Sequence, residues 1–324
     1  MTFSWSKIKK PIIALAPMAG YTDSAYRQIV KKIAPEVVCF SELTSINAIT
    51  HNNEKTLKML NFDKSESPLI MQLFGNDPNF FAESGKRLEQ FGIAGIDINM
   101  GCPVRKVVKN EQGSALIKNP SLAGEIVNKL SKTVKIPVSV KIRIGYSKYD
   151  EKEFTEFIKS LEQAGAKLIT IHGRTTKQGF SGTANWEPIY LAKKILKIPV
   201  IGNGDITTPE TAEQRLKSPY GKITLDGLMI GRATFGNPWL LAEIEARLNH
   251  KKYTPPRSLK AKIPTIKTHL KLSIKILGEK LALLEMRKHL VSYIRDIENA
   301  SYFRQKIVQA KNLDEIISIL NEIA

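Results

Sequence analysis

Short apolar runs recur along the first three quarters of the chain and alternate with stretches of helical periodicity. Most runs are continuously apolar rather than alternating, which is typical of strands buried on both faces of a parallel sheet. Intervening stretches such as PNFFAESGKRLEQF and EFTEFIKSLEQAGA repeat apolar residues at the spacing of an amphipathic helix. The apolar runs cover residues 12–18, 36–42, 68–74, 95–101, 137–143, 167–173, 199–205 and 227–233.

Eight strands separated by helices predict an α/β fold of the (β/α)8 TIM-barrel type. A doubly wound open sheet is the alternative, but IIALAPMAGYTDSAYR lacks the GxGxxG expected after its first strand. After residue 245 the remaining sequence has only helical patterns, and YTPPRS (253–258) has the composition of a linker. We therefore predict a TIM-barrel domain over residues 1–245, followed by a small all-α C-terminal domain over residues 246–324.

Composition narrows the class of protein. The 324 residues contain two cysteines, too few for a disulfide framework, which favours a reducing compartment. No stretch approaches the roughly 18 uninterrupted apolar residues of a membrane span, and prolines interrupt the N-terminal apolar run. We expect a cytoplasmic protein that does not enter a membrane.

The charge is strongly unbalanced, with 49 Lys and Arg against 31 Asp and Glu and a formal net charge of +18. Such a charge attracts polyanions, which for a soluble chain usually means nucleic acid. Residues 246–278 contain nine Lys or Arg and no acidic residue. Lys267, Lys271 and Lys275 recur every four residues and share one helical face, which could contact a polyanion or simply be solvated.

Polar and glycine-rich residues gather at the C-terminal ends of the predicted strands, whereas the strand starts are mostly Pro, Lys or Gly. In a barrel these ends point into one shared mouth, so the pattern predicts a single site there. The residues at these ends are Pro17, Met18, Ala19, Ser41, Glu42, Gln72, Asn99, Cys102, Lys141, Arg143, His172, Arg174, Asn203, Gly204, Asp205, Gly231 and Arg232.

The loops after the last two strands indicate the ligand class. GNGDITTPE and IGRATFGNP are glycine-rich, and such loops commonly bind a phosphate at this place in a barrel, although glycine also permits simple tight turns. Lys141 ends an apolar strand and needs an anionic partner, either a ligand or a salt bridge to Asp97 or Glu42. His172 could belong to the site or be a hydrogen-bonded core residue.

The two cysteines have different surroundings. Cys39 lies in the apolar segment EVVCFSE and is expected in the core. Cys102 lies in DINMGCPV without the spacing of a metal site, so we expect no metal. At a barrel mouth this thiol could act as a nucleophile or as a proton donor.

Taken together, these segments resemble the tRNA-dihydrouridine synthase family over nearly the whole chain. APMAGYTD, MQLFG, DINMGCPVRKV, GSAL, VKIR, IHGRT, NGDI and MIGRA stand in the family's order, and RKHLVSYIR resembles the helical domain of its bacterial nitrogen-regulation-protein-like branch. The resemblance implies an FMN-dependent oxidoreductase that uses NADPH (or NADH) to reduce the C5=C6 bond of uridines in tRNA. It also implies D-loop positions as targets and a monomeric enzyme.

The resemblance also assigns roles to residues. Cys102 would be the general acid that protonates C5 after hydride reaches C6. Asn99, Arg143 and Arg174 would bind the substrate, and Lys267, Lys271 and Lys275 would contact tRNA phosphates. The residues implied in cofactor binding are Pro17, Met18, Ala19, Gln72, Lys141, His172, Asn203, Gly204, Asp205, Gly231 and Arg232. KNEQGSAL departs from the more usual GAGSAL at Glu111 and Gln112, which leaves the role of that loop in RNA contact open.

Two other functions remain open from the residues. A flavin barrel acting on a free pyrimidine, as in dihydroorotate or dihydropyrimidine metabolism, would share the mouth but have no use for a basic helical tail. A non-catalytic RNA-binding protein would have no use for the combination of Cys102, Lys141 and His172.

Overall fold

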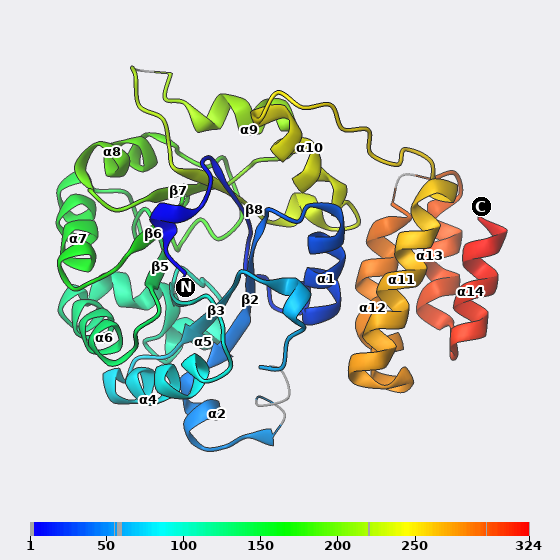
Figure 1. The fold of residues 1–324 in the computed structure, drawn as a ribbon, viewed down its shortest axis with the longest axis horizontal. Coiled ribbons are helices and arrows are strands. Elements are labelled where there is room, and N and C mark those ends of the chain that lie inside the picture. Colours follow the sequence, from blue (N-terminus) through cyan, green and yellow to red (C-terminus); the bar gives the residue numbers. More distant parts are fainter. Residues whose placement is uncertain (1–2, 55, 57–59, 220, 296, 324) are drawn as a thin grey trace.

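Eight parallel strands close into a barrel in sequence order, β1 to β8, and helices cover its outside (Figure 1). The computed structural model describes residues 3–54, 56, 60–219, 221–295 and 297–323. The barrel confirms the predicted TIM-barrel class, and every predicted apolar run overlaps a strand. The strands are β1 (Ile12–Leu15), β2 (Val38–Ser45), β3 (Leu69–Phe74), β4 (Gly95–Met100), β5 (Val138–Arg143), β6 (Leu168–His172), β7 (Val200–Asn203) and β8 (Gly227–Ile230).

The strands are buried on both faces, but the two faces differ in chemistry. Side chains that point outward, such as Ile96, Ile98 and Val140, join the large apolar cluster shared with the surrounding helices. Those that point inward form a second apolar cluster near the strand starts, which includes Phe40 and Trp5 of the N-terminal segment. Above it the inward positions of β3 to β7 become polar, and this change places the site at the C-terminal end of the barrel.

The helices around the barrel begin at side-chain caps that the sequence supplies. Asp23, Asp77, Asn119, Asp150 and Thr208 each accept a hydrogen bond from a backbone N–H in the first turn of the following helix. The helices are α1 (Ser24–Ile33), α2 (Ile46–Thr50), α4 (Pro78–Glu89), α5 (Arg105–Lys109), α6 (Pro120–Thr133), α7 (Glu151–Gln163), α8 (Glu187–Ile195), α9 (Pro209–Leu216) and α10 (Trp239–Leu248), with short 3-10 turns η1 (Trp5–Lys7), η2 (Lys64–Glu66), η3 (Gly113–Lys118) and η4 (Arg232–Thr234).

The second strand departs from the expected boundaries. The apolar run ended at Glu42, but β2 continues to Ser45, with an irregular register against β3 between Phe40 and Leu43. Ser41 and Glu42 therefore lie at a bulge inside the strand rather than at its end. These polar residues end the apolar run at the bulge, so the run gives no signal for the rest of the strand.

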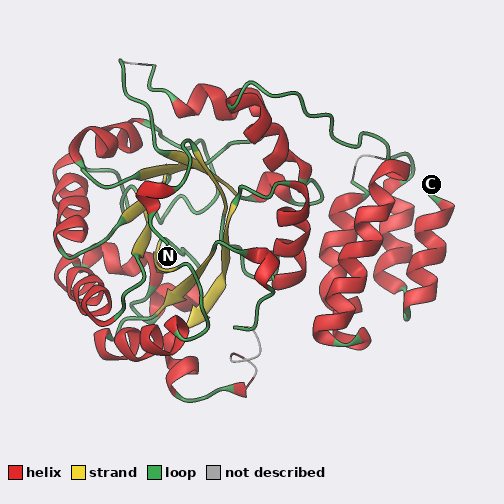
Figure 2. Cartoon of the chain, in the orientation of Figure 1, coloured by secondary structure: helices red, strands yellow, loops and turns green. Residues whose placement is uncertain are grey.

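Further helices follow the barrel, joined to α10 by residues 249–258, which form no helix or strand, and the first of these helices packs against α1 (Figures 1 and 2). They are α11 (Leu259–Leu277), α12 (Glu279–Tyr293), α13 (Ala300–Gln309) and α14 (Leu313–Glu322). Their shared apolar cluster also includes Trp239 of α10, and Ile33 of α1 packs against it. A side chain at Gly236 would collide with the backbone of Ser292, so glycine there permits the β8 loop to approach α12 closely.

None of the helices in the described ranges combines the length and the hydrophobicity that a membrane span requires.

Candidate functional site

A cavity of about 750 Å³ opens among the loops after the strands, and we call it the mouth cavity. Most residues predicted for the site line it, from segments spread between residues 17 and 232 of the chain. The predicted residues that line it are Pro17, Met18, Ala19, Asn99, Cys102, Lys141, Arg143, His172, Asn203, Gly204, Asp205, Gly231 and Arg232. Gln72 and Arg174 do not line it; Gln72 is fully buried and Arg174 is nearly so.

Strand register explains why these side chains converge. Asn99 of β4 pairs with Lys141 of β5, and Arg143 of β5 pairs with His172 of β6. His172 pairs in turn with Asn203 of β7. Because paired residues in a sheet point to the same face, one alternation places all five inside the barrel.

The turn that carries Cys102 is held by a side chain from its own strand. The Oδ1 atom of Asn99 accepts hydrogen bonds from the backbone N–H groups of Gly101 (3.2 Å) and Cys102 (2.9 Å). Arg143 donates from Nε to the carbonyl oxygen of Gly101 over 2.7 Å. The backbone that positions the sulfur is therefore fixed by two strands, β4 and β5.

The GSAL segment packs directly under this turn. Ser114 is fully buried, and both its hydroxyl (2.8 Å) and its N–H (3.1 Å) donate to the carbonyl oxygen of Cys102. The neighbouring Glu111 has a φ of 57°, a left-handed conformation that glycine adopts without steric cost. A glycine would therefore suit the backbone at position 111, and the buried serine of GSAL supports the turn that carries Cys102.

The thiol of Cys102 is protonated at neutral pH. Burial raises its pKa above the ordinary value, against the opposing effects of the Val104 N–H and of the Arg143 and Lys141 charges. Cys39, in contrast, is completely buried in the core as expected, and burial raises its pKa to about 12. Of the two thiols, Cys102 is the one that a ligand in the mouth cavity could contact.

Lys141 is a half-buried cation at the cavity. Burial and the neighbouring Arg143 lower its pKa to about 8, while Asp97 acts in the opposite direction. Its ammonium donates to Oδ1 of Asn203 over 3.1 Å, and the ion pairs found within the described ranges include neither of the suggested bridges to Asp97 or Glu42. The remaining alternative, an anionic ligand as its partner, fits this arrangement.

His172 is neutral in this environment. Burial, together with the positive charges of Lys141 and Arg143, lowers its pKa to about 2. A neutral imidazole offers one donor and one acceptor rather than a charge. His172 therefore lines the cavity as a hydrogen-bonding group.

The loop after β7 has an unusual backbone, because Gly204 (φ 127°) and Asp205 (φ 53°) both have positive φ. Asp205 accepts a 2.8 Å hydrogen bond from the Ala184 N–H and forms a 2.8 Å ion pair with Arg174. Partial burial alone would raise the pKa of Asp205, but these two hydrogen bonds lower it overall. Arg174 therefore does not contact the cavity but holds the loop after β7 in place through its ion pair with Asp205.

The donor set fits an anionic cofactor of flavin mononucleotide type. Among the described residues that line the cavity, Asp205 is the one carboxylate, against the cations of Lys141, Arg143, Arg232 and Arg295. The volume lies in the usual range of small-molecule sites, roughly 300–1,000 Å³. Within the described ranges, no group of three or more His, Cys, Asp or Glu side chains is arranged to hold a metal ion.

Several cavity residues escaped prediction. Phe180 is 57% exposed, and the guanidinium groups of Arg232 and Arg143 lie 4.8 and 5.7 Å from its ring centre. Tyr21 and Phe235, from the loops after β1 and β8, stack with ring centres 3.7 Å apart. Tyr21 directly follows APMAG and could have been included on that ground, whereas Arg295, which follows α12, gives no local signal.

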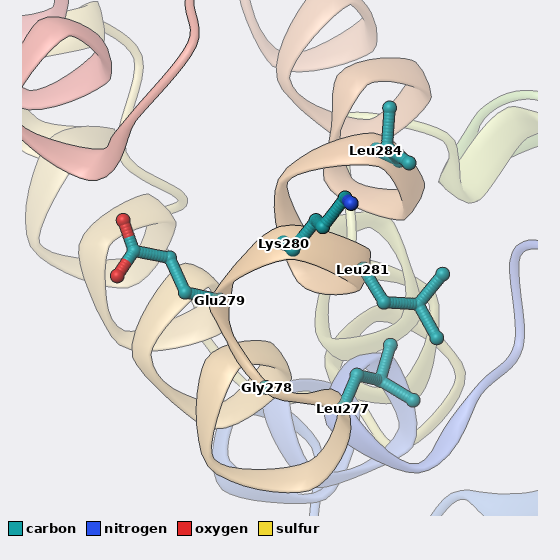
Figure 3. A pocket seen from close by; sticks show the side chains of 6 residues that line it. All are labelled: Leu277, Gly278, Glu279, Lys280, Leu281 and Leu284. Atoms are coloured by element: carbon teal, nitrogen blue, oxygen red, sulfur yellow. The ribbon is translucent and has the colours of Figure 1, made fainter.

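The predicted lysine face lies away from the mouth cavity, on α11. Lys271 and Lys275 are exposed, whereas Lys267 is half-buried and donates to Oδ1 of Asn321 in α14 over 2.9 Å. A separate hollow of about 360 Å³ lies at the turn between α11 and α12 (Figure 3). Its lining is mainly the leucines Leu277, Leu281 and Leu284.

Comparisons with known proteins identify the family of the chain. Residues 14–323 match the family described as dihydrouridine synthase. The chain is 35% identical to "Probable tRNA-dihydrouridine synthase 1" of Synechocystis sp. over 95% of this chain and 84% of that protein. It is 36% identical to tRNA-dihydrouridine synthase B of Pasteurella multocida (90% and 86% covered) and 33% identical to that of Pseudomonas aeruginosa (93% and 89%). The chain therefore belongs to the dihydrouridine synthase family of oxidoreductases.

Proposed function

We propose that this enzyme reduces the C5=C6 bond of uridines in tRNA, with FMN bound in the mouth cavity and NADPH (or NADH) as the reductant. One observation carries the proposal: a protonated thiol, Cys102, shares a strongly cationic cavity with the enclosed Lys141. Reduction of a uracil adds a hydride to C6 and a proton to C5, so the site needs a proton donor as well as a place for an anionic cofactor.

The cofactor would occupy the side of the cavity formed by the loops after β1, β7 and β8. Pro17, Met18 and Ala19 would border its ring system, and residues 203–205 would hold the phosphate together with Gly231 and Arg232. When bound, reduced FMN would supply the hydride. Lys141 would hydrogen-bond the pyrimidine edge of the ring, since its ammonium needs an anionic neighbour in this enclosed position.

Cys102 would give its proton to C5 of the uracil as negative charge develops there. Its raised pKa keeps the proton on sulfur until then. The thiolate that remains would be stabilised by Arg143 and Lys141, whose charges favour the ionised form. A proton from solvent would restore the thiol before the next turnover.

The uracil itself would lie between Cys102 and the cofactor. Asn99 and Arg143 would border it, and neutral His172 would offer a hydrogen bond without competing as an acid. A uridine inside folded RNA must be extruded to reach this position, at a cost of a few kcal/mol. Favourable phosphate contacts elsewhere on the enzyme would offset that cost.

Residues 246–324 would supply those contacts as a tRNA-binding domain, with Lys271 and Lys275 as exposed cations on α11. Arg295, which lines the mouth cavity, would bring a positive charge from this domain to the entrance. A free pyrimidine would need neither, which is why we favour tRNA over a small substrate. We further propose that the enzyme acts as a monomer and on D-loop positions.

The test uses the purified full-length protein, FMN and NADPH with three substrates: unmodified tRNA, free uracil and orotate. We expect bound flavin, and dihydrouridine formation in tRNA alone. Turnover of the free bases without turnover of tRNA would instead support a small-pyrimidine reductase. A protein that binds tRNA but neither binds flavin nor oxidises NADPH would contradict an enzymatic role.

A further inference from the structure

Asp97 is a carboxylate at the centre of the barrel that the proposed chemistry does not use. It is 0% exposed and lies on β4, paired in register with Gln72 of β3 and Ser139 of β5. Burial raises its pKa to about 6 despite hydrogen bonds from Ser139 and Gln72 and the charge of Lys141. A buried carboxylate is costly, so its presence in a barrel core requires an explanation.

The contacts of Asp97 begin a directed chain of hydrogen bonds. Its Oδ1 accepts from the Ser139 hydroxyl over 2.6 Å, and its Oδ2 accepts from Nε2 of Gln72 over 2.7 Å. The other end of the Gln72 amide, Oε1, accepts from Nδ2 of Asn99 over 2.7 Å. The oxygen of Asn99 then faces the backbone N–H groups of Gly101 and Cys102.

The direction of this chain follows from the chemistry of its first member. An ionised carboxylate can only accept hydrogen bonds, so Gln72 must present its NH2 group to Asp97 and its oxygen to Asn99. Asn99 must then present its own NH2 group to Gln72 and its oxygen to the thiol turn. Each amide has one donor end and one acceptor end, so the orientation of the first determines that of the second.

A neutral amide at position 97 would remove this constraint. It could donate to Gln72, which would allow both amides to rotate and bring the NH2 group of Asn99 against two backbone N–H groups. Donors facing donors form no hydrogen bond, so in that rotated state the turn would lose the two hydrogen bonds that Asn99 gives it.

We propose that Asp97 is a positioning residue for Cys102, acting through the amides of Gln72 and Asn99. This inference rests on the proposed function, in which the sulfur must stand at a defined place beside the substrate. Misplacement of a reacting group by about 1 Å can cost roughly 100-fold in rate, so an effect of this kind is measurable.

The test compares wild-type full-length enzyme with Asp97→Asn, which preserves shape and removes the charge. We expect uridine reduction in tRNA to fall about 10-fold or more, with flavin binding and NADPH-driven flavin reduction changed by less than about two-fold. We also expect Cys102 to react several-fold faster with iodoacetamide, because its turn is loosened. Ser139→Ala is the matched control, since it removes the other hydrogen bond to the same carboxylate but leaves the orientations of the Gln72 and Asn99 amides unchanged.

The double variant Asp97→Asn with Gln72→Glu provides a rescue. A carboxylate at position 72 accepts from both neighbours, so Asn99 again presents its oxygen to the thiol turn, and the alkylation rate should return to the wild-type value. Unchanged uridine reduction and alkylation in Asp97→Asn would overturn the inference. An equal loss of flavin reduction by NADPH and of uridine reduction would also overturn it. Absence of uridine reduction in the wild type would contradict the proposed function instead, and the alkylation rates would still decide the role of Asp97.

Discussion

The hydroxyl of Ser114 donates to the carbonyl oxygen of Cys102 over 2.8 Å, although twelve residues separate the two. The serine is fully buried, and its backbone N–H donates to the same oxygen. GSAL therefore binds the carbonyl of the turn that carries Cys102, while Asn99 binds the backbone N–H groups of the same turn. Arg143 of β5 also donates to the neighbouring carbonyl of Gly101, so the position of the sulfur depends on GSAL, β4 and β5 together.

Replacing Ser114 with Ala should loosen this turn without disturbing the cofactor side of the cavity. We expect a loss of about 1 kcal/mol in the free energy of unfolding, the usual contribution of one hydrogen bond. Uridine reduction should fall several-fold while NADPH oxidation is retained. Ser131→Ala is a suitable control, because its hydroxyl bonds to Asn128 and Ala164 away from the cavity. Equal effects of the two variants on uridine reduction would contradict the role of Ser114.

A buried histidine pair predicts sensitivity to acid where α11 and α12 meet α1 of the barrel. His269 and His289 have ring centres 4.7 Å apart, and both rings lie beside Tyr26 of α1. Burial lowers the pKa of each to about 3 from 6.5. For His289, the charges of His269 and Lys288 act in the same direction and that of Asp23 in the opposite one.

Between pH 6.5 and pH 3 the unfolded chain therefore binds protons at these two positions that the folded protein does not bind. Stability should fall as the pH is lowered through this window, and denaturant titrations at a series of pH values measure it. Neither ring nitrogen of His289 has a hydrogen-bond partner among the described residues, so His289→Phe should fold normally at pH 7 and lose less stability in acid. An unchanged acid dependence in that variant would contradict the assignment.

The lysine face of α11 predicts a salt-dependent contribution to tRNA binding. Replacing Lys271 and Lys275 with Ala should weaken binding and lower the slope of log affinity against log salt by about 0.7–0.9 per lost phosphate contact. Filter binding or fluorescence anisotropy at several salt concentrations gives this slope. Lys159→Ala is the control, since Lys159 is exposed on α7, on the far side of the barrel from α11 (Figure 1). The same slope in the double variant and in the control would exclude the contact.

The barrel could be predicted because the sequence features that indicate each strand lie within that strand or directly beside it. Each strand carries its own apolar run, and the polar residues at the strand ends are adjacent to those runs in the sequence. The predicted end of β2 was wrong because the polar residues Ser41 and Glu42 end the apolar run at the bulge, whereas the strand continues to Ser45. Such a bulge arises from pairing with β3, which a single segment does not reveal.

The candidate site was predicted less completely, for reasons that are also physical. Asn99 and Lys141 follow from strand periodicity, whereas Phe180 and Phe235 depend on how loops fold over the barrel. Arg295 lies at the cavity just after α12, which packs closely against the loop at Gly236, and this tertiary contact has no sequence pattern. The hydrogen bonds of Asp97 likewise depend on strand register, and the sequence suggested only a salt bridge for it.

The most direct test of the central claim is a single-turnover measurement on Cys102→Ala. The wild type and the Cys102→Ala variant are each loaded with FMN, and the flavin is reduced with NADPH. The rate at which unmodified tRNA reoxidises the flavin is then followed in the absence of oxygen. We predict that reoxidation by tRNA is about 100-fold slower or more in the variant, the usual contribution of a general acid, while flavin reduction by NADPH is unchanged. Equal rates of reoxidation by tRNA in the variant and the wild type would contradict the assignment of Cys102 as the proton donor.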